Sequence, residues 1–221
     1  MYRVIPILTD AEVQECRRIA ASAQFSDGRI TNPHNPAKVN EQLHDSGAYQ
    51  NSAKLLHQAL VRSEDLHRFA FPVLVAPPLL TRYKPGMHYG PHTDVAFLQA
   101  TPNMSIRSDI SCTIFLNDPE EYEGGALKIQ LGDGVMRFKL KPGEAIVYPS
   151  DTLHEVEAVT EGERLVGITF MQSRIPDPFR RNLLYNLNEV AALEGLKMSQ
   201  ENYTLLQLVQ NQLLRYWGEK P

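Results

Sequence analysis

Cysteine is scarce in this chain: Cys16 and Cys112 are the only two among 221 residues, and they form no CxxC pair. This scarcity excludes a disulfide framework and a zinc knuckle. Long apolar runs are also missing, because no stretch approaches the roughly 18 apolar residues of a membrane span. The first ten residues lack the apolar run of a signal peptide. We therefore expect a soluble cytoplasmic protein with no membrane partner.

An excess of basic charge is missing as well. Lys and Arg together number 22 against 26 Asp and Glu, which gives a formal net charge of -4. Proteins that bind nucleic acid by neutralising phosphates are usually basic, so no nucleic-acid partner is expected. Low-complexity bias is absent too. With 43% hydrophobic residues, the chain suits one folded domain with a sizeable core.

The spacing of apolar residues predicts a β-rich middle between two helical ends. Thr9 and Glu12 form a capping box at the start of a first helix, and a second helix is expected over about 52–62. The polar segment 26–50 between them is rich in Gly, Pro, Asn and His, and we interpret it as a long loop. Beyond residue 176, leucine spacing predicts two further helices.

The middle of the chain consists of short runs rich in Val, Ile, Leu, Thr, Phe and Tyr, separated by turn residues. Eight short strands at this spacing predict a sandwich or a double-sheet jelly roll. We expect an all-β core over 77–175, an N-terminal helical support region over 1–76 and a C-terminal helical extension over 176–221. The predicted strands are 79–83, 92–97, 110–116, 126–131, 135–140, 144–148, 153–159 and 164–172.

One His-x-Asp motif, His92 to Asp94, is predicted at the start of a strand, where alternation would put both side chains on one face. A second histidine, His154, opens a later strand. Two imidazoles and one carboxylate make a facial triad that leaves three positions open on octahedral iron(II). Arg164 opens the next apolar strand, where a buried guanidinium needs an anion such as a dicarboxylate. The alternative is a surface His92–Asp94 pair and a salt-bridged Arg164.

These residues also carry a resemblance to a known family. The segment 83–94 reads Tyr-Lys-Pro-Gly-Met-His-Tyr-Gly-Pro-His-Thr-Asp. Together with 111–117, 123–127, His154 and Arg164, it resembles the iron(II)/2-oxoglutarate-dependent dioxygenases. Within them the chain is similar to the prolyl 4-hydroxylase group, and most of all to the bacterial PKHD-type hydroxylases. The resemblance covers 77–175 and extends to the N-terminal part through a Lys-x-Asn-x-Gln pattern at 38–42.

The resemblance implies a double-stranded β-helix, the jelly roll, and a role for each matching residue. His92, Asp94 and His154 match the iron ligands. Arg164 matches the residue that holds the distal carboxylate of 2-oxoglutarate, and Tyr83 matches a tyrosine whose hydroxyl reaches the same co-substrate.

One position departs from the family pattern. Phe115 stands where many animal prolyl hydroxylases have a tyrosine that assists the arginine, and a phenyl ring cannot donate a hydrogen bond. Thr113, two residues earlier on the same face, is the candidate to take over this contact. Tyr89 matches a tyrosine near the iron, although core packing explains it equally well. His88 fits a pocket or surface residue better than a ligand. Arg107 and the loop 99–108 either close over substrate or form a solvated loop.

As to activity, the resemblance implies a dioxygenase that uses Fe(2+), 2-oxoglutarate and molecular oxygen. It would hydroxylate a prolyl or other peptidyl residue, or a small molecule, with succinate and CO2 as co-products. The carboxylate of Asp94 favours hydroxylation over halogenation. L-ascorbate as a reductant and a homodimer are left open. The alternative function is a non-catalytic cupin-like module that binds a metal or a sugar.

Overall fold

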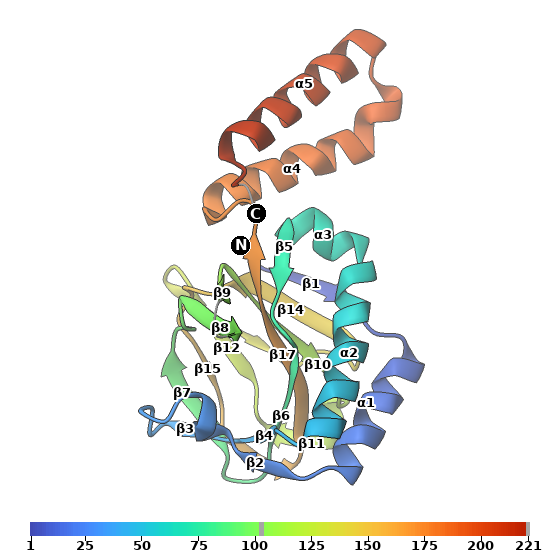
Figure 1. Cartoon of the computed structure of the whole chain (residues 1–221). Helices are drawn as coiled ribbons and strands as arrows, with labels where there is room; N and C mark the ends of the chain where they lie inside the picture. Colours follow the sequence, from blue (N-terminus) through green and yellow to red (C-terminus); the bar gives the residue numbers. More distant parts are fainter. Residues whose placement is uncertain (102–103, 220–221) are drawn as a thin grey trace.

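The computed structural model describes residues 1–101 and 104–219. Two antiparallel sheets lie face to face and enclose part of the apolar core, and helices pack on the outer face of the larger sheet (Figure 1). This is the jelly-roll core with helical flanks that the sequence predicted. Residues 1–76 contribute strands to both sheets in addition to their helices.

In the described residues the larger sheet runs in the order β1-β14-β10-β17-β6-β4-β2, and β5 also pairs with β17. The smaller sheet runs β13-β12-β15-β7-β3, and two further pairs are β11 with β16 and β8 with β9. The strands of the larger sheet are β1 (Arg3–Pro6), β2 (Phe25–Asp27), β4 (Glu41–Leu43), β5 (Pro72–Val75), β6 (Leu79–Tyr83), β10 (Ile110–Phe115), β14 (Glu144–Pro149) and β17 (Arg164–Ser173). The others are β3 (Lys38–Val39), β7 (His88–His92), β8 (Phe97–Thr101), β9 (Met104–Arg107), β11 (Tyr122–Gly124), β12 (Leu127–Leu131), β13 (Gly134–Phe138), β15 (His154–Val156) and β16 (Val159–Gly162).

Strand β10 shows how alternation positions the site. All six of its residues are buried, but they serve two different environments. Ile110, Cys112 and Ile114 belong to the core that the helices cover, whereas Phe115 belongs to the core between the two sheets. Because side chains alternate along a strand, Ser111 and Thr113 share the inner face with Phe115. The inner face of this strand therefore carries polar groups into the centre of the jelly roll.

Helices close the outer face of the larger sheet. The N-terminal three are α1 (Asp10–Ser22), α2 (Ser46–Arg62) and α3 (Glu64–Ala70), and the short 3-10 turns are η1 (Gly28–Thr31), η2 (Pro119–Glu121) and η3 (Gly195–Lys197). The predicted capping box is confirmed: the Thr9 side chain accepts from the amide of Glu12, and the Glu12 carboxylate accepts from the amide of Thr9. The guanidinium of Arg62 also pairs with Glu12, which ties α2 to the start of α1.

The two predicted C-terminal helices are α4 (Pro178–Glu194) and α5 (Gln200–Trp217). Asp177 caps α4 by accepting from the amide of Arg180, with proline following the cap as expected. The two helices project from the end of the sandwich (Figure 1), and α5 contains no buried residue. None of the described helices is both long enough and apolar enough to cross a lipid bilayer.

Two sequence expectations were wrong. The segment 26–50 is not one loop, because β2, η1, β3, β4 and the first turns of α2 lie in it. Its strands are only two or three residues long, which is too short to show the alternation of polar and apolar residues that predicts a strand. The expected strand 92–97 does not exist either: β7 ends at His92, β8 begins at Phe97, and Asp94 lies between them.

Candidate metal centre and co-substrate pocket

The two histidines of the triad meet across paired strands. His92 ends β7 and His154 begins β15, and the two residues are direct partners in the register. Asp94 follows in the loop after β7. One ligand atom from each of the three side chains lies within 4.8 Å of the others, and His154 Nε2 is 3.6 Å from Asp94 Oδ2. The surface-pair alternative does not fit, since His92 is half-buried and only 13% of the Asp94 side chain is exposed.

Backbone carbonyls fix which imidazole nitrogens face this centre. His92 Nδ1 lies 2.7 Å from the carbonyl oxygen of Gly90, and His154 Nδ1 lies 2.9 Å from that of Thr152. A carbonyl oxygen only accepts, so each Nδ1 carries the proton and donates it. Each Nε2 then has a free lone pair, which is the arrangement of a metal-binding histidine held by its surroundings.

Two serines support the carboxylate of Asp94. The Ser111 hydroxyl donates to Asp94 Oδ2 over 2.5 Å. Because that proton is used, the 2.8 Å contact between Ser111 Oγ and Ser150 Oγ is donated by Ser150. The amide of Asp94 in turn donates to the carbonyl of Ser150 over 3.2 Å. Together these bonds hold both the side chain and the backbone of Asp94, although it lies in a loop.

Burial sets the protonation preferences of the triad. It lowers the pKa of His92 to about 4, aided by the neighbouring His154 and opposed by the bond to Gly90. His92 is therefore neutral near pH 7 and able to bind a metal. Burial raises the pKa of Asp94, against the charge of His154 and the hydrogen bond from Ser111. A cation placed between the three groups would favour the ionised carboxylate.

Arg164 is a buried cation without an anion. It opens β17 directly opposite Tyr83 in the register, and 1% of its surface is exposed. Its Nε and Nη1 have no hydrogen-bond partner, and no carboxylate of the described residues forms an ion pair with it. The rings of Tyr83 and Phe115 lie 5.0 and 5.4 Å from its Cζ. Two unpaired N–H groups of one guanidinium fit the two oxygens of a carboxylate.

Tyr83 is poised to be a second donor beside Arg164. Its hydroxyl accepts from Asn40 Nδ2 over 2.9 Å, so its own proton is free for another acceptor. Burial raises the pKa of Tyr83, against the charge of Arg164. Space behind Asn40 is tight, because a Cβ on Gly28 would lie 1.8 Å from Asn40 Oδ1. Glycine at position 28 thus allows Asn40 to reach Tyr83.

The structure places Thr113 on the cavity wall next to Tyr148. Burial raises the pKa of Tyr148 well above its ordinary value, and a hydrogen bond with Thr113 acts against that rise. The hydroxyl of Thr113 is therefore shared with a tyrosine that the sequence analysis did not single out. Tyr148 also lies edge-on to His154, with ring centroids 5.3 Å apart.

The triad, Ser111, Tyr83, Asn40, Thr113, Tyr148 and Arg164 line one cavity of about 420 Å³ that opens between the sheets. Tyr89 is in its wall, and its ring stacks on His92 with centroids 3.5 Å apart. His88 is not part of the wall; its Nδ1 lies 3.3 Å from the carbonyl of Gly86. The six groups expected at the site from the sequence all border this cavity: Tyr83, His92, Asp94, Thr113, His154 and Arg164.

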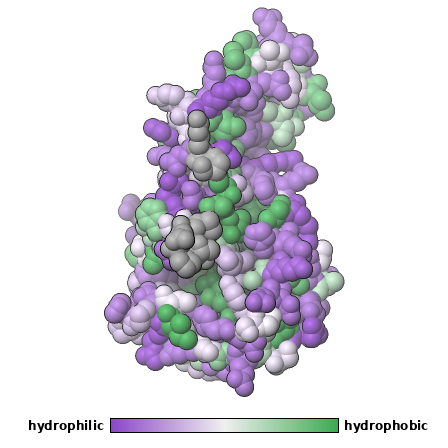
Figure 2. All heavy atoms as spheres, in the orientation of Figure 1, coloured by the Kyte–Doolittle hydropathy of each residue, from purple (hydrophilic) through white to green (hydrophobic). Residues whose placement is uncertain are grey.

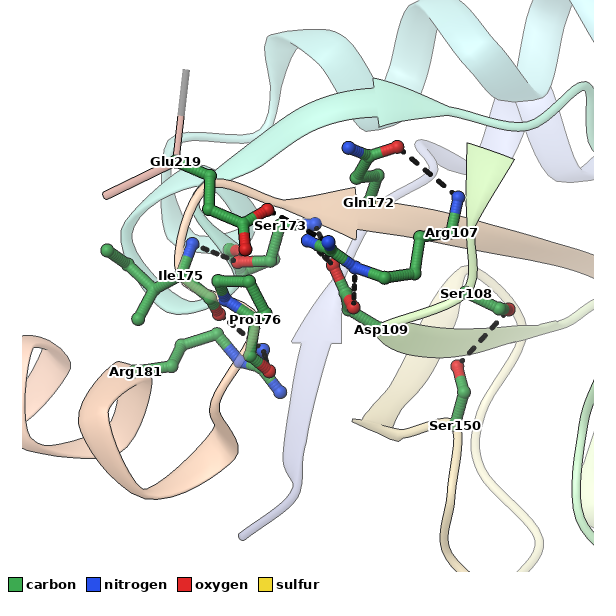
Figure 3. A network of polar contacts seen from close by, with 11 residues as sticks. Arg107, Ser108, Asp109, Ser150, Gln172, Ser173, Ile175, Pro176, Arg181 and Glu219 are labelled. Atoms are coloured by element: carbon green, nitrogen blue, oxygen red, sulfur yellow. Dashed lines mark hydrogen bonds and ion pairs between the residues drawn. The ribbon is translucent and has the colours of Figure 1, made fainter. Parts of the chain in front are cut away.

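The β8–β9 hairpin supplies Leu98 and Ile106 to the cavity wall. Arg107 is the last residue of β9 and connects the hairpin to the rest of the chain. Arg107 pairs with Asp109 over 2.7 Å and with Glu219 over 2.8 Å (Figure 3). Arg107 is thus held by two carboxylates, with 27% of its side chain exposed, and it does not line the cavity. Part of the predicted loop 99–108, residues 102 and 103, lies outside the described residues.

One charged residue of the cavity wall escaped the sequence analysis as a site residue. Lys38 on β3 is 5% exposed, and its Nζ donates to Thr31 Oγ1. Burial lowers the pKa of Lys38 to about 8, against the charges of Asp94 and Asp27. The signal that could have revealed it is the alternation of Lys38, Asn40 and Gln42, which are all buried and all line the cavity.

Comparisons with known proteins agree with this geometry. The model of the 2OG-Fe(II) oxygenase superfamily matches residues 78–172. A PKHD-type hydroxylase of Sphingopyxis alaskensis is 58% identical over 217 residues, which are 98% of this chain and 99% of that protein. One of Thermosynechococcus vestitus is 39% identical and covers 99% of each chain.

Solved structures share the fold. A prolyl-4-hydroxylase from Pseudomonas putida superposes with a TM-score of 0.52 at 21% identity, covering 77% of this chain and 92% of that one. The non-heme alpha ketoglutarate dependent epimerase SnoN gives a TM-score of 0.56 at 16% identity, over 79% of this chain and 78% of the other.

Proposed function

The chain belongs to the PKHD-type hydroxylases of the 2OG-Fe(II) oxygenase superfamily, and from that premise we propose which of its residues carry the reaction. It is an iron(II)- and 2-oxoglutarate-dependent dioxygenase. We assign His92, Asp94 and His154 to iron, and Arg164 and Tyr83 to 2-oxoglutarate, with Thr113 as the further candidate contact. We further propose residues 77–175 as the dioxygenase core, with 1–76 and 176–221 as its flanking regions.

The single observation that carries these assignments is the unpaired Arg164 in the same cavity as the triad. A buried guanidinium without a counter-ion is costly, and a carboxylate ligand removes that cost. The donor set of the triad, two imidazoles and one carboxylate, suits iron(II) and leaves positions for other ligands. A cupin-like module that only binds metal would leave Arg164 without a purpose.

Iron and 2-oxoglutarate, when bound, supply the oxidising chemistry that hydroxylates a substrate and releases succinate and CO2. The chain supplies placement. His92 and His154 present Nε2 because their Nδ1 protons are held by carbonyls. Arg164 offers two N–H groups, and Tyr83 offers its O–H, to the distal carboxylate of the co-substrate.

The decisive test measures iron content and conversion of 2-oxoglutarate to succinate in His154→Ala. We expect iron to fall far below one per chain and succinate formation to stop, with the β-sheet circular dichroism retained. His57→Ala, an exposed histidine on α2, is the matched control and should behave as wild type. A His154→Ala protein with full iron and full turnover would refute the triad.

The prime substrate that we propose is a prolyl or other peptidyl residue, or a small molecule.

We also propose that the chain forms a homodimer through α4 and α5. Apolar side chains gather on these helices, visible as green atoms on the projecting pair in Figure 2. Sedimentation equilibrium tests this: a monomer at all concentrations contradicts it. The exposed apolar residues there include Phe179, Leu193, Leu196, Leu205 and Tyr216.

A further inference from the structure

A lysine ammonium is buried beside the metal centre. Lys38 lies on β3, which pairs with β7, the strand that ends at His92. Its Nζ is 5.5 Å from the ring centroid of Tyr89, and that ring stacks on His92 with centroids 3.5 Å apart. Since both distances run to one centroid, Nζ is no more than about 9 Å from the imidazole ring. A small molecule bound at the metal could therefore reach the ammonium.

The ammonium has little protein to pair with. Of its three N–H donors, one is used by Thr31 Oγ1. No carboxylate of the described residues lies within ion-pairing distance of Nζ; Asp27 and Asp94 act on its charge only from farther away. A lysine that is 5% exposed usually has an anionic partner, because burying an unpaired ammonium is costly.

The charges of the loaded cavity lead to the same conclusion. Among the described residues of its wall, Asp94 carries a carboxyl group, and Lys38 and Arg164 carry an amine and a guanidinium. The negative charge of Asp94 and the two charges of 2-oxoglutarate balance those of iron(II) and Arg164. The ammonium of Lys38 is then the one charge left without a counterpart. It is available to an anion that arrives with the prime substrate.

We propose that Lys38 binds a carboxylate of the prime substrate, so that this chain hydroxylates carboxylic acids in preference to their neutral analogues. This inference rests on the proposed function, because it assumes that iron and 2-oxoglutarate occupy their places. Polar neighbours support it: the Thr31 hydroxyl donates to Gln42 Oε1 over 3.0 Å, and Asn32 Nδ2 donates to the Tyr89 hydroxyl over 3.1 Å. These bonds fix the wall around the ammonium.

A second role for Lys38 has to be separated from this one. Its charge also stabilises the ionised form of Asp94. If that were its purpose, removing the charge would weaken iron binding and leave the choice of substrate unchanged. If Lys38 recognises the substrate, removing its charge abolishes the preference for acids. If it only supports Asp94, removing its charge weakens iron binding instead.

The test uses the whole protein, loaded anaerobically with iron and saturating 2-oxoglutarate, so that binding is measured without turnover. Isothermal titration calorimetry compares L-amino acids with their carboxamides. It then compares dipeptides that end in a free carboxylate with the same dipeptides amidated. We expect at least one acid to bind on the order of tenfold to a hundredfold more tightly than its amide. Binding by dipeptides alone identifies the end of a peptide as the source of the carboxylate.

Variants assign the preference to Lys38. Lys38→Met keeps the length of the side chain without its charge and should bring the acid-to-amide ratio close to one, whereas Lys38→Arg should keep part of it. Lys197→Met is the matched control on an exposed lysine and should keep the wild-type ratio.

Several results would overturn the inference. These are equal binding of acids and amides, no binding by any acid, competition of the acid with 2-oxoglutarate, or an undiminished ratio in Lys38→Met. Loss of iron in Lys38→Met with an undiminished ratio would assign the residue to Asp94 instead. The proposed function is tested separately by succinate formation in wild type. A wild-type protein that forms no succinate refutes that function, whereas one that forms succinate without an acid preference refutes only the role of Lys38.

Discussion

Replacing Arg164 by methionine should make the protein more stable and its co-substrate binding weaker. Methionine keeps most of the stem that packs near Gly125, but it removes a guanidinium that is 1% exposed with two unpaired nitrogens. Each buried polar group without a partner costs about 1–3 kcal/mol. Two such nitrogens would cost about 2–6 kcal/mol, and loss of the contacts with the rings of Tyr83 and Phe115 offsets part of this. We therefore expect Arg164→Met to gain about 1–3 kcal/mol in the free energy of unfolding without 2-oxoglutarate. In a chain of this length, that corresponds to a melting temperature about 2–10 °C higher.

The same change removes the partner of the distal carboxylate. Loss of one member of a buried charge pair costs about 2–5 kcal/mol, so the Kd for 2-oxoglutarate should rise roughly thirtyfold to a few thousandfold. In wild type, 2-oxoglutarate at about 100 times its Kd should add about 2.7 kcal/mol to the stability. At the same concentration Arg164→Met should gain less than about 0.9 kcal/mol. Higher stability without 2-oxoglutarate combined with weaker binding of 2-oxoglutarate is expected only if the buried cation has no partner until the ligand binds.

Anaerobic thermal unfolding with and without 2-oxoglutarate, together with titration of the metal-to-ligand absorbance, measures both effects. Arg181→Met is the matched control, because Arg181 is also buried but donates from Nη1 to the carbonyls of Ile175 and Pro176, over 2.8 and 3.0 Å. It should lower the melting temperature and leave the Kd for 2-oxoglutarate unchanged. If Arg164→Met melts lower than wild type and binds 2-oxoglutarate equally well, Arg164 is a structural residue and the reasoning fails.

Three further changes test other parts of the structure. Ser111→Ala removes the 2.5 Å bond to Asp94, so iron affinity measured by competition with a chelator should fall about tenfold to a hundredfold. Gly28→Ala forces Asn40 aside, so the KM for 2-oxoglutarate should rise while iron content stays at wild type. The bond with Arg62 lowers the pKa of Glu12 to about 2, so Glu12 adds stability above its unfolded value near 4.5 that is lost as the pH falls toward 2. Glu12→Gln should reduce that acid-induced loss in chemical denaturation by less than about 1 kcal/mol, because the pair is partly exposed.

Matched controls accompany these changes. Ser108→Ala removes only a 3.4 Å contact with Ser150 and should leave iron affinity unchanged; an equal loss would mean that any serine in this region matters. Gly47→Ala adds a Cβ whose nearest neighbour is 3.8 Å away, so an effect on KM equal to that of Gly28→Ala would contradict the packing argument. An unchanged acid profile in Glu12→Gln would show that the pair does not contribute.

The sequence predicted most of the central strands because their apolar residues alternate between two cores. It located β6 at Leu79–Tyr83 and β10 to within one residue. The strands β2, β3 and β4 escaped because they are only two or three residues long and because Lys38 and Gln42 are polar residues at buried positions. Lys38, Asn40 and Gln42 alternate as strictly as apolar residues do, but burial of polar side chains depends on partners elsewhere in the chain, which a local pattern does not contain.

The sequence indicated six side chains of the candidate site, but it missed Lys38 and Tyr148 in the cavity wall and did not give the geometry. Motif resemblance indicated His92 and His154, and the register shows them as direct partners. Asp94 was expected on the same strand face, whereas it lies in a loop that Ser111 and Ser150 hold in place. That support comes from β10 and from the end of β14, far along the chain. Long-range contacts of this kind follow from the topology and not from the spacing around the motif.

The order of strands in the larger sheet has a consequence for how this chain is made. Strand β17 lies between β10 and β6 and also pairs with β5, yet it is the last of these strands in the sequence. Until residue 173 has left the ribosome, the strands on either side of it keep unpaired edges. At about 5–20 residues per second, roughly five to twenty seconds pass between the synthesis of β6 and that of β17. Unpaired edges of this kind favour aggregation, and β17 removes them by pairing with the strands on both sides.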